Sequence, residues 1–296
     1  MSSQAASRRE PACPVSIDQG ELIMAPSSSD LFTTASSAAE HARRISPLEP
    51  INRPLLDRLG EIADDCLVLD AACGIGEPTL AVARQHPGVR VLGIDMDEAA
   101  LEVARTRAVE QGLGNVEFRA MSFEELDLPA ASVGAALSRL GVLLFGDPVA
   151  AARELARVLA PGAPFSLGLW SAPDDNPYMR LGREALAAVL PSDLLPGIPP
   201  RFAPLGSSTA VEGWLTEAGM STVHSEVFQW HVPFPDLDAW WAYITTAGPL
   251  NGLFAGLDTD ARHTARTHMA QLISDSQTPS GGYEIESRCR LVWGTR

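Results

Sequence analysis

Short apolar runs alternate with amphipathic segments across the middle of the chain. Leu67–Ala71 and Pro164–Trp170 are mainly apolar over the length of a strand, as is typical of strands buried on both faces. Glu98–Gln111 has polar and apolar positions at helical spacing and follows a candidate N-cap, Asp97. The expected elements are, in order, strand Leu67–Ala71, helix Thr79–Gln85, strand Val89–Asp95, helix Glu98–Gln111, strands Val116–Ala120 and Val133–Ser138, helix Pro148–Leu159 and strand Pro164–Trp170. Strand–helix–strand units of this length require right-handed crossovers, so the pattern predicts a doubly wound α/β fold around a parallel sheet.

The regular alternation stops after Trp170. Residues 171–206 contain many prolines and one expected helix, Met179–Leu190. An insert of this kind in a compact domain is usually a binding loop or a lid. Regular elements then return, with an expected helix Thr209–Ala218, strand Thr222–Val232, helical segments within 236–275 and a last strand near Tyr283–Trp293.

This pattern divides the chain into a tail and one domain. Residues 1–30 are rich in serine, alanine and proline and lack periodicity, so we expect a mobile tail. Residues 31–296 are expected to form a single domain. Within it we expect a core of about 54–170 and 207–296, and lid elements at about 31–50, 171–206 and 236–275.

Charge and composition exclude several classes of function. The chain has no lysine, which excludes a P-loop lysine and Schiff-base chemistry. Its net charge of −15 argues against a nucleic-acid partner, whose phosphates require a basic surface. No apolar stretch approaches the ~20 residues of a membrane helix or forms a secretory signal, so we expect a cytoplasmic protein with no membrane partner. The four cysteines include no C-x-x-C pair, and we expect neither a metal site nor disulfides.

The strongest chemical signal follows the first expected strand, in the sequence VLDAACGIGEP at residues 68–78. Ligands of open α/β sheets bind beyond the carboxyl ends of the strands, near the switch in strand order. Gly74 and Gly76 allow a ligand to lie against the backbone there. Asp95 ends the second expected strand, 19 positions after Gly76, where a carboxylate accepts hydrogen bonds from ribose hydroxyls.

A nicotinamide cofactor fits this segment less well. The third glycine of a dinucleotide-binding G-x-G-x-x-G motif falls on Thr79, and Pro78 supplies no backbone N–H for a pyrophosphate. A ligand without phosphates is therefore favoured. A glycine turn with a surface aspartate and no ligand is the structural alternative.

The segment from Leu67 to Trp170 resembles a class I S-adenosylmethionine-dependent methyltransferase, of the subgroup similar to the ubiquinone/menaquinone-biosynthesis enzymes. The resemblance rests on the stretches VLDAACGIGEPTLAVA, VLGIDMDEAALEVA, FRAMSFEELDLP and SRLGVLLFGDPVAAARELARVLAPG. It implies a Rossmann-like, seven-stranded, mostly parallel sheet with an antiparallel last strand and helical lid insertions. It also implies S-adenosylmethionine as cofactor and S-adenosylhomocysteine as product.

The resemblance assigns a role to each matching residue. The residues implied at the methionine end of the cofactor are Asp70, Ala72, Gly74 and Gly76. Asp95 would hold the ribose, and Met96 would pack on the adenine. Ser122 and Phe123 would face the other side of the adenine, and the backbone carbonyl of Ser138 would accept from the ammonium group.

Three positions depart from the family pattern. Ala72 replaces the first motif glycine and crowds the turn. Ser122 stands where an acidic residue commonly binds the adenine amino group, and Val133-Gly134 replaces the usual Phe-Asp. These departures weaken expected cofactor contacts without removing Asp95 or the two glycines.

Substrate contacts are expected from the lid regions, although no catalytic residue is assigned. The candidate substrate-pocket residues are Trp170, Tyr178, His231, Trp240 and Trp241. Packing of the lid on the sheet is the alternative role for the aromatic residues. Asp175-Asn-Pro-Tyr178 resembles the D/N-P-P-Y motif of methyltransferases acting on nucleic acids, but it has one proline and follows the fifth strand rather than the fourth.

The resulting hypothesis is methyl transfer to an O, N or C atom of a small, apolar metabolite in bacterial secondary metabolism, by a monomer or homodimer. One alternative is an enzyme that binds the cofactor and catalyses a non-methylating reaction such as cyclisation. Another is a non-catalytic binding module with a decayed site.

Overall fold

The computed structural model describes residues 46–141, 147–172, 176–195, 207–246 and 250–296, and these contain one seven-stranded sheet. The strand order is β3-β2-β1-β4-β5-β7-β6. The strands are β1 (Leu67–Ala71), β2 (Arg90–Asp95), β3 (Val116–Ala120), β4 (Ala135–Arg139), β5 (Pro164–Trp170), β6 (Thr222–Phe234) and β7 (Tyr283–Thr295). Only β7 runs against its neighbours, pairing antiparallel with both β5 and β6. The expected mostly parallel sheet with an antiparallel last strand is confirmed.

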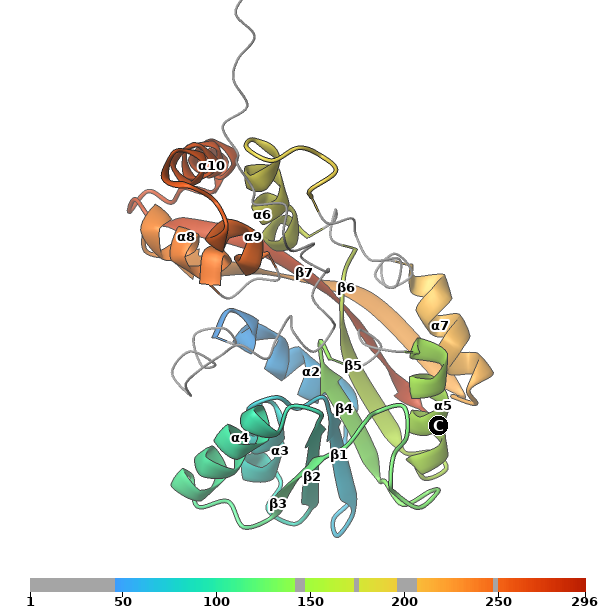
Figure 1. Ribbon diagram of the computed structural model, residues 1–296. Helices are drawn as coiled ribbons and strands as arrows, with labels where there is room; N and C mark the ends of the chain where they lie inside the picture. Colours follow the sequence, from blue (N-terminus) through green and yellow to red (C-terminus); the bar gives the residue numbers. More distant parts are fainter. Residues whose placement is uncertain (1–45, 142–146, 173–175, 196–206, 247–249) are drawn as a thin grey trace, which may run out of the picture.

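Helices cover both faces of the sheet, as Figure 1 shows. One face carries η1 (Ser46–Ile51), α2 (Asn52–Leu59), α3 (Thr79–Gln85) and α4 (Glu98–Glu110). The other face carries α5 (Pro148–Val158) and α7 (Ser208–Glu217). The expected N-cap is confirmed, because Asp97 Oδ1 accepts from the backbone N–H groups of Ala99 and Ala100.

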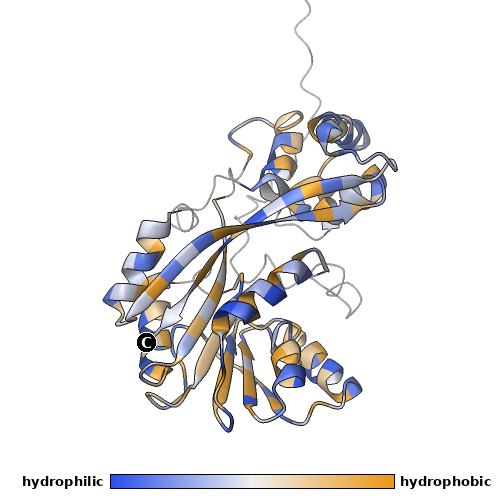
Figure 2. Ribbon diagram, turned by 180° about the vertical axis from the view of Figure 1, so that it is seen from behind, coloured by the Kyte–Doolittle hydropathy of each residue, from blue (hydrophilic) through white to orange (hydrophobic). Residues whose placement is uncertain are grey.

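A second group of helices packs on the ends of β6 and β7 that extend beyond the sheet (Figure 1). These are α6 (Pro177–Ala187), α8 (Leu237–Thr246), α9 (Asn251–Ala255) and α10 (Thr259–Leu272), followed by the short η5 (Ser274–Ser276). In Figure 2 the short central strands are mainly apolar, whereas the long β6–β7 pair alternates in hydropathy. That alternation reflects one face of the pair packed on helices and the other exposed.

Three sequence expectations fall on segments that the structure does not describe. They are the tail at residues 1–30, most of the lid element at 31–50, and part of the lid element at 171–206. The division into core and lid therefore remains a prediction.

A loop joins β3 to β4 where the neighbouring crossovers contain helices. Arg157 on α5 donates to the backbone carbonyls of Leu126 and Leu128, each at 2.8 Å. Glu154 accepts from the Leu126 N–H at 2.8 Å. These bonds pair the polar backbone of the loop, which otherwise lacks partners from a helix.

Candidate functional site

The loop after β1 turns sharply toward α3. Ala72, Gly74 and Gly76 all have left-handed φ angles, of 58°, 53° and 92°. A side chain on Gly76 would come within 3.2 Å of Ala104 and Leu80, so this glycine allows the helices to approach the turn closely. A Cβ on Gly74 would meet no atom within 4 Å. The turn is therefore packed on its helix side and open above Gly74.

Asp95 faces this turn from the end of β2. Its Oδ2 accepts from the Gly74 N–H at 2.8 Å, and its Oδ1 accepts from the Asp97 N–H at 3.0 Å. Burial raises the pKa of the Asp95 carboxyl, and the two backbone donors oppose that shift. Each carboxylate oxygen can still accept a further hydrogen bond. Asp95 thus fixes the turn and presents acceptors to a ligand above it.

Asp70 lies beneath the turn with none of its surface exposed. Its Oδ2 accepts from the Thr79 hydroxyl, and its Oδ1 has no hydrogen-bond partner. Burial raises the pKa of Asp70 to about 7. A buried carboxyl with a free oxygen responds strongly to nearby charge.

The expected adenine contacts come from the ends of β2 and β3. Met96 is 74% exposed, and the Met121 N–H donates to the Asp95 carbonyl at 3.0 Å. Ser122 Oγ accepts from the Glu124 N–H at 3.3 Å, and Phe123 is partly buried against the core. The apolar side chains of Met96 and Phe123 therefore lie in segments adjoining Asp95, while Ser122 offers only a hydroxyl.

The backbone at the end of β4 faces two different strands. The Leu140 N–H donates to the Gly168 carbonyl at 2.8 Å, so Leu140 and Ser138 face β5. Consistent with this, a Cβ on Gly168 would lie 3.7 Å from the Ser138 carbonyl oxygen. Arg139 consequently faces β1, whose last ladder pair with β4, Asp70–Leu137, lies two residues before Arg139. The backbone carbonyls of Ser138 and Arg139 therefore face different strands, and the expected role of the Ser138 carbonyl in binding the ammonium group stays a prediction.

Gly141 accommodates the alanine that replaces the first motif glycine. A Cβ on Gly141 would lie 2.2 Å from the Ala72 Cβ. The crowding expected from Ala72 is thus relieved by a glycine from the segment after β4.

This contact predicts that Gly141→Ala lowers the free energy of unfolding by roughly 1–3 kcal/mol, the usual cost of overpacking. Adding Ala72→Gly should restore most of the loss, because it removes the clashing Cβ and relaxes the left-handed φ. Urea denaturation of the single and double variants measures both effects. Gly114→Ala is the control, since its Cβ would meet nothing within 4 Å. A double variant as unstable as the single one would contradict the packing account.

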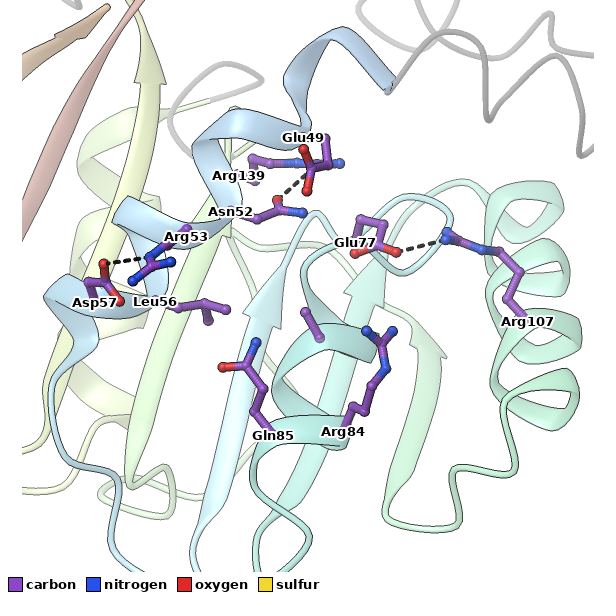
Figure 3. Close-up of a pocket in the computed structure, with 11 residues that line it drawn as sticks. Glu49, Asn52, Arg53, Leu56, Asp57, Glu77, Arg84, Gln85, Arg107 and Arg139 are labelled. Carbon is purple, nitrogen blue, oxygen red and sulfur yellow. Dashed lines mark hydrogen bonds and ion pairs between the residues drawn. The ribbon is translucent and has the colours of Figure 1, made fainter. Parts of the chain in front are cut away.

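A groove of about 650 Å³ lies between η1–α2 and α3, beside the turn (Figure 3). Its lining residues are Glu49, Asn52, Arg53, Leu56, Asp57, Glu77, Ala81, Arg84, Gln85, Arg107 and Arg139. Four arginines and three carboxylates give the lining a net charge of about +1, in a chain whose net charge is −15. Arg139 donates to Asn52 Oδ1 at 2.8 Å, whereas Arg107 pairs with Glu77 at 2.7 Å.

None of the residues predicted for cofactor binding lines this groove, but two lining residues adjoin them in sequence. Glu77 follows Gly76, and Arg139 follows Ser138. The sequence analysis did not indicate that Arg139 lines a groove; its position directly after Ser138 was the available signal.

The expected substrate-pocket residues occupy different surroundings. Trp240 is fully buried, with its ring centroid 4.9 Å from that of Phe234, and Trp241 packs edge-on against Phe254. Both tryptophans thus pack against neighbouring aromatic side chains of β6 and α9. Trp170 is buried at the end of β5, and His231 is exposed on β6. The side chain of Tyr178 is outside the described part of the chain.

Asn176, from the segment resembling a nucleic-acid motif, has a structural contact. Its Nδ2 donates to the Arg288 carbonyl at 3.0 Å, one residue beyond the last β5–β7 pair. The side chain therefore pairs a backbone group that β5 is too short to reach.

Within the described ranges, no three His, Cys, Asp or Glu side chains gather in a way that could hold a metal ion. Among the helices that the structure describes, none is long and apolar enough to cross a membrane.

Comparison with known proteins places these features in context. Residues 68–162 match a family model described as a methyltransferase domain. Nocamycin O-methyltransferase of Saccharothrix syringae is 30% identical over 187 residues, which are 58% of this chain and 66% of that protein. A ubiquinone biosynthesis O-methyltransferase of Bordetella avium is 30% identical over 183 residues, 60% of this chain and 72% of that protein. The chain thus spans just under two thirds of the nocamycin enzyme and more of the second relative.

Among solved structures, the fold is similar to that of a putative methyltransferase from Bacillus halodurans. The TM-score is 0.56 at 20% identity, covering 82% of this chain and 97% of that one. At this level of identity the likeness supports the fold alone.

Proposed function

Because the chain belongs to the class I S-adenosylmethionine-dependent methyltransferase family, we propose that it transfers a methyl group from S-adenosylmethionine to a small molecule. The relatives include nocamycin O-methyltransferase and a ubiquinone biosynthesis O-methyltransferase, which supports a small metabolite as acceptor. The net charge of −15 argues against nucleic acid as acceptor.

The observation that carries this proposal is the arrangement of Asp95 and the glycine turn. Two backbone N–H groups fix the Asp95 carboxylate, and the turn beside it is open above Gly74. A nucleoside placed there can donate its two ribose hydroxyls to Asp95 while its adjoining chain passes over the turn. Asp70, Gly76 and the Arg139 carbonyl would then surround the methionyl end.

The bound cofactor supplies a methyl group on a cationic sulfur, which needs no further activation by the protein. The chain's own contribution is to orient the cofactor and exclude water from the acceptor. Asp70 contributes negative potential beneath the turn when it is ionised. Met96 and Phe123 offer apolar contact for the adenine.

The acceptor is proposed to be an apolar metabolite held between the carboxyl ends of β4 and β5 and the helices α6, α8, α9 and α10. Trp170 and the exposed His231 are proposed to reach this space. We propose that the protein acts in the cytoplasm, in bacterial secondary metabolism, as a monomer or homodimer.

Incubation with methyl-tritiated S-adenosylmethionine and panels of phenolic, quinone-precursor and polyketide acceptors tests the proposal. Transfer of label to one acceptor, with an equal amount of S-adenosylhomocysteine released, is the expected result. Conversion of an acceptor without release of S-adenosylhomocysteine would instead favour a non-methylating reaction. Absence of S-adenosylmethionine binding would contradict the proposal and favour a non-catalytic module.

A further inference from the structure

Arg139 carries a largely buried positive charge that the described protein leaves without a carboxylate partner. Its guanidinium donates to Asn52 Oδ1, a neutral acceptor, and makes no ion pair with any carboxylate of the described ranges. Burial lowers the pKa of the Arg139 guanidinium, whereas the charges of Glu77, Asp70 and Glu49 act in the opposite sense without forming an ion pair with it. A desolvated charge without a close counter-ion is unfavourable, so an anion bound beside it would be stabilised.

The other charged groups of the groove are arranged differently. Glu77 is paired with Arg107 at 2.7 Å, and Arg53 lies 3.6 Å from Asp57 with both side chains exposed. Arg84 donates to Gln111 at 2.7 Å, near the opposite end of α3 from the turn. In Figure 3, Arg139 and Asn52 lie at the end of the groove nearest the ends of β1 and β4, together with Glu49. Arg139 is thus the cation closest to the open turn that has no carboxylate partner.

The backbone and the side chain of Arg139 offer hydrogen-bonding groups of opposite kinds. Its backbone faces β1, because Leu140 bonds to β5 and successive residues of a strand alternate in direction. Its side chain enters the groove beside α2. One residue therefore offers a carbonyl to a cation and a guanidinium to an anion. The methionyl end of the cofactor has both partners, since its ammonium and carboxylate groups are attached to the same carbon.

We propose that Arg139, positioned by Asn52, binds the carboxylate at the methionyl end of the cofactor and thereby determines specificity for ligands that carry this group. This role rests on the proposed function and assigns one side chain, that of Arg139, to one group of the cofactor, the carboxylate. Asn52 is a positioning residue, because it holds the guanidinium from α2 across 87 positions of sequence.

A cycle of two proteins and two ligands tests the proposal. S-adenosylhomocysteine and its decarboxylated analogue are titrated by calorimetry into the wild type and Arg139→Gln. The expected result is a 10- to 100-fold weaker affinity of Arg139→Gln for S-adenosylhomocysteine, the range for a charge-assisted pair, and little change for the decarboxylated analogue. The wild type should itself bind the analogue more weakly by a similar factor.

Two further variants provide controls. Arg84→Gln removes a groove arginine away from the turn, and it should leave both affinities within about twofold. Asn52→Ala should weaken only S-adenosylhomocysteine, by less than Arg139→Gln, and it provides the same comparison if Arg139→Gln does not fold. Equal weakening of both ligands, or of neither, would overturn the proposal for Arg139 alone. No binding of S-adenosylhomocysteine to the wild type would overturn the proposed function as well.

Discussion

Asp95→Asn is expected to weaken S-adenosylhomocysteine binding by about 100-fold or more. The ribose would lose two charge-assisted hydrogen bonds, each worth roughly 1.5–3 kcal/mol. The new amide would also direct its NH₂ group at either the Gly74 N–H or the Asp97 N–H, both of which now donate to the carboxylate. The turn would therefore lose one of its two fixed contacts. Isothermal titration calorimetry measures the affinity, and circular dichroism reports whether the variant is folded.

Asp97→Asn is the matched control for this substitution. It makes the same chemical change two residues away, at an N-cap where asparagine is as good as aspartate. Its affinity for S-adenosylhomocysteine should stay within about threefold of the wild type. If a folded Asp95→Asn also stays within threefold, Asp95 does not hold the ribose.

Asp70→Asn is expected to change how the stability of the ligand-free protein depends on pH. The folded-state pKa of Asp70, about 7, lies above the unfolded value of 3.8, so folding favours the protonated carboxyl. The wild type should then lose stability as the pH rises from about 4 to 7, by a few kcal/mol at most at 1.36 kcal/mol per unit. Asparagine keeps an acceptor for the Thr79 hydroxyl and does not ionise. The variant should therefore be the more stable protein at pH 8 and should gain little or nothing at pH 4.

Urea denaturation at pH 4.5, 6 and 8 measures this difference. Asp127→Asn, a substitution of an exposed carboxyl in the loop between β3 and β4, should follow the wild-type profile. Stabilities of the wild type and Asp70→Asn that run parallel across this range would show that Asp70 keeps an ordinary pKa. Asp70→Asn should also bind cationic S-adenosylmethionine with lower affinity than the wild type at pH 8. Its affinity for S-adenosylhomocysteine, whose sulfur is neutral, should fall less.

Much of the parallel part of the fold could be predicted because its signals are local. The strand Leu67–Ala71 and helix Thr79–Gln85 have the bounds that the sequence indicates. Apolar runs, glycine or proline stops and the Asp97 cap are each read from neighbouring residues. Strands β6 and β7 each extend two residues beyond their predicted ends, to Phe234 and Thr295. These residues pair with distant segments, Phe234 with Tyr283 and Thr295 with Pro164 and Thr222, which neighbouring residues do not reveal.

The side-chain environments of the site depend on contacts that are distant in sequence. Arg139 meets Asn52 from α2, and Gly141 makes room for Ala72. The sequence also does not reveal which neighbouring strand each residue of β4 faces, so the direction of the Arg139 backbone could not be predicted. Likewise, the burial of Trp240 follows from its contact with Phe234. Such contacts require the arrangement of the chain in space.

The central claim is that this chain binds S-adenosylmethionine and its product at the turn between β1 and α3. Thermal unfolding of the full chain with and without S-adenosylhomocysteine tests it most directly. A concentration 100 times the dissociation constant should add about 2.7 kcal/mol to the free energy of unfolding and raise the melting temperature by roughly 5 °C or more. Asp95→Asn should show a much smaller shift at the same concentration. An unchanged melting temperature of the wild type at millimolar ligand would contradict the claim.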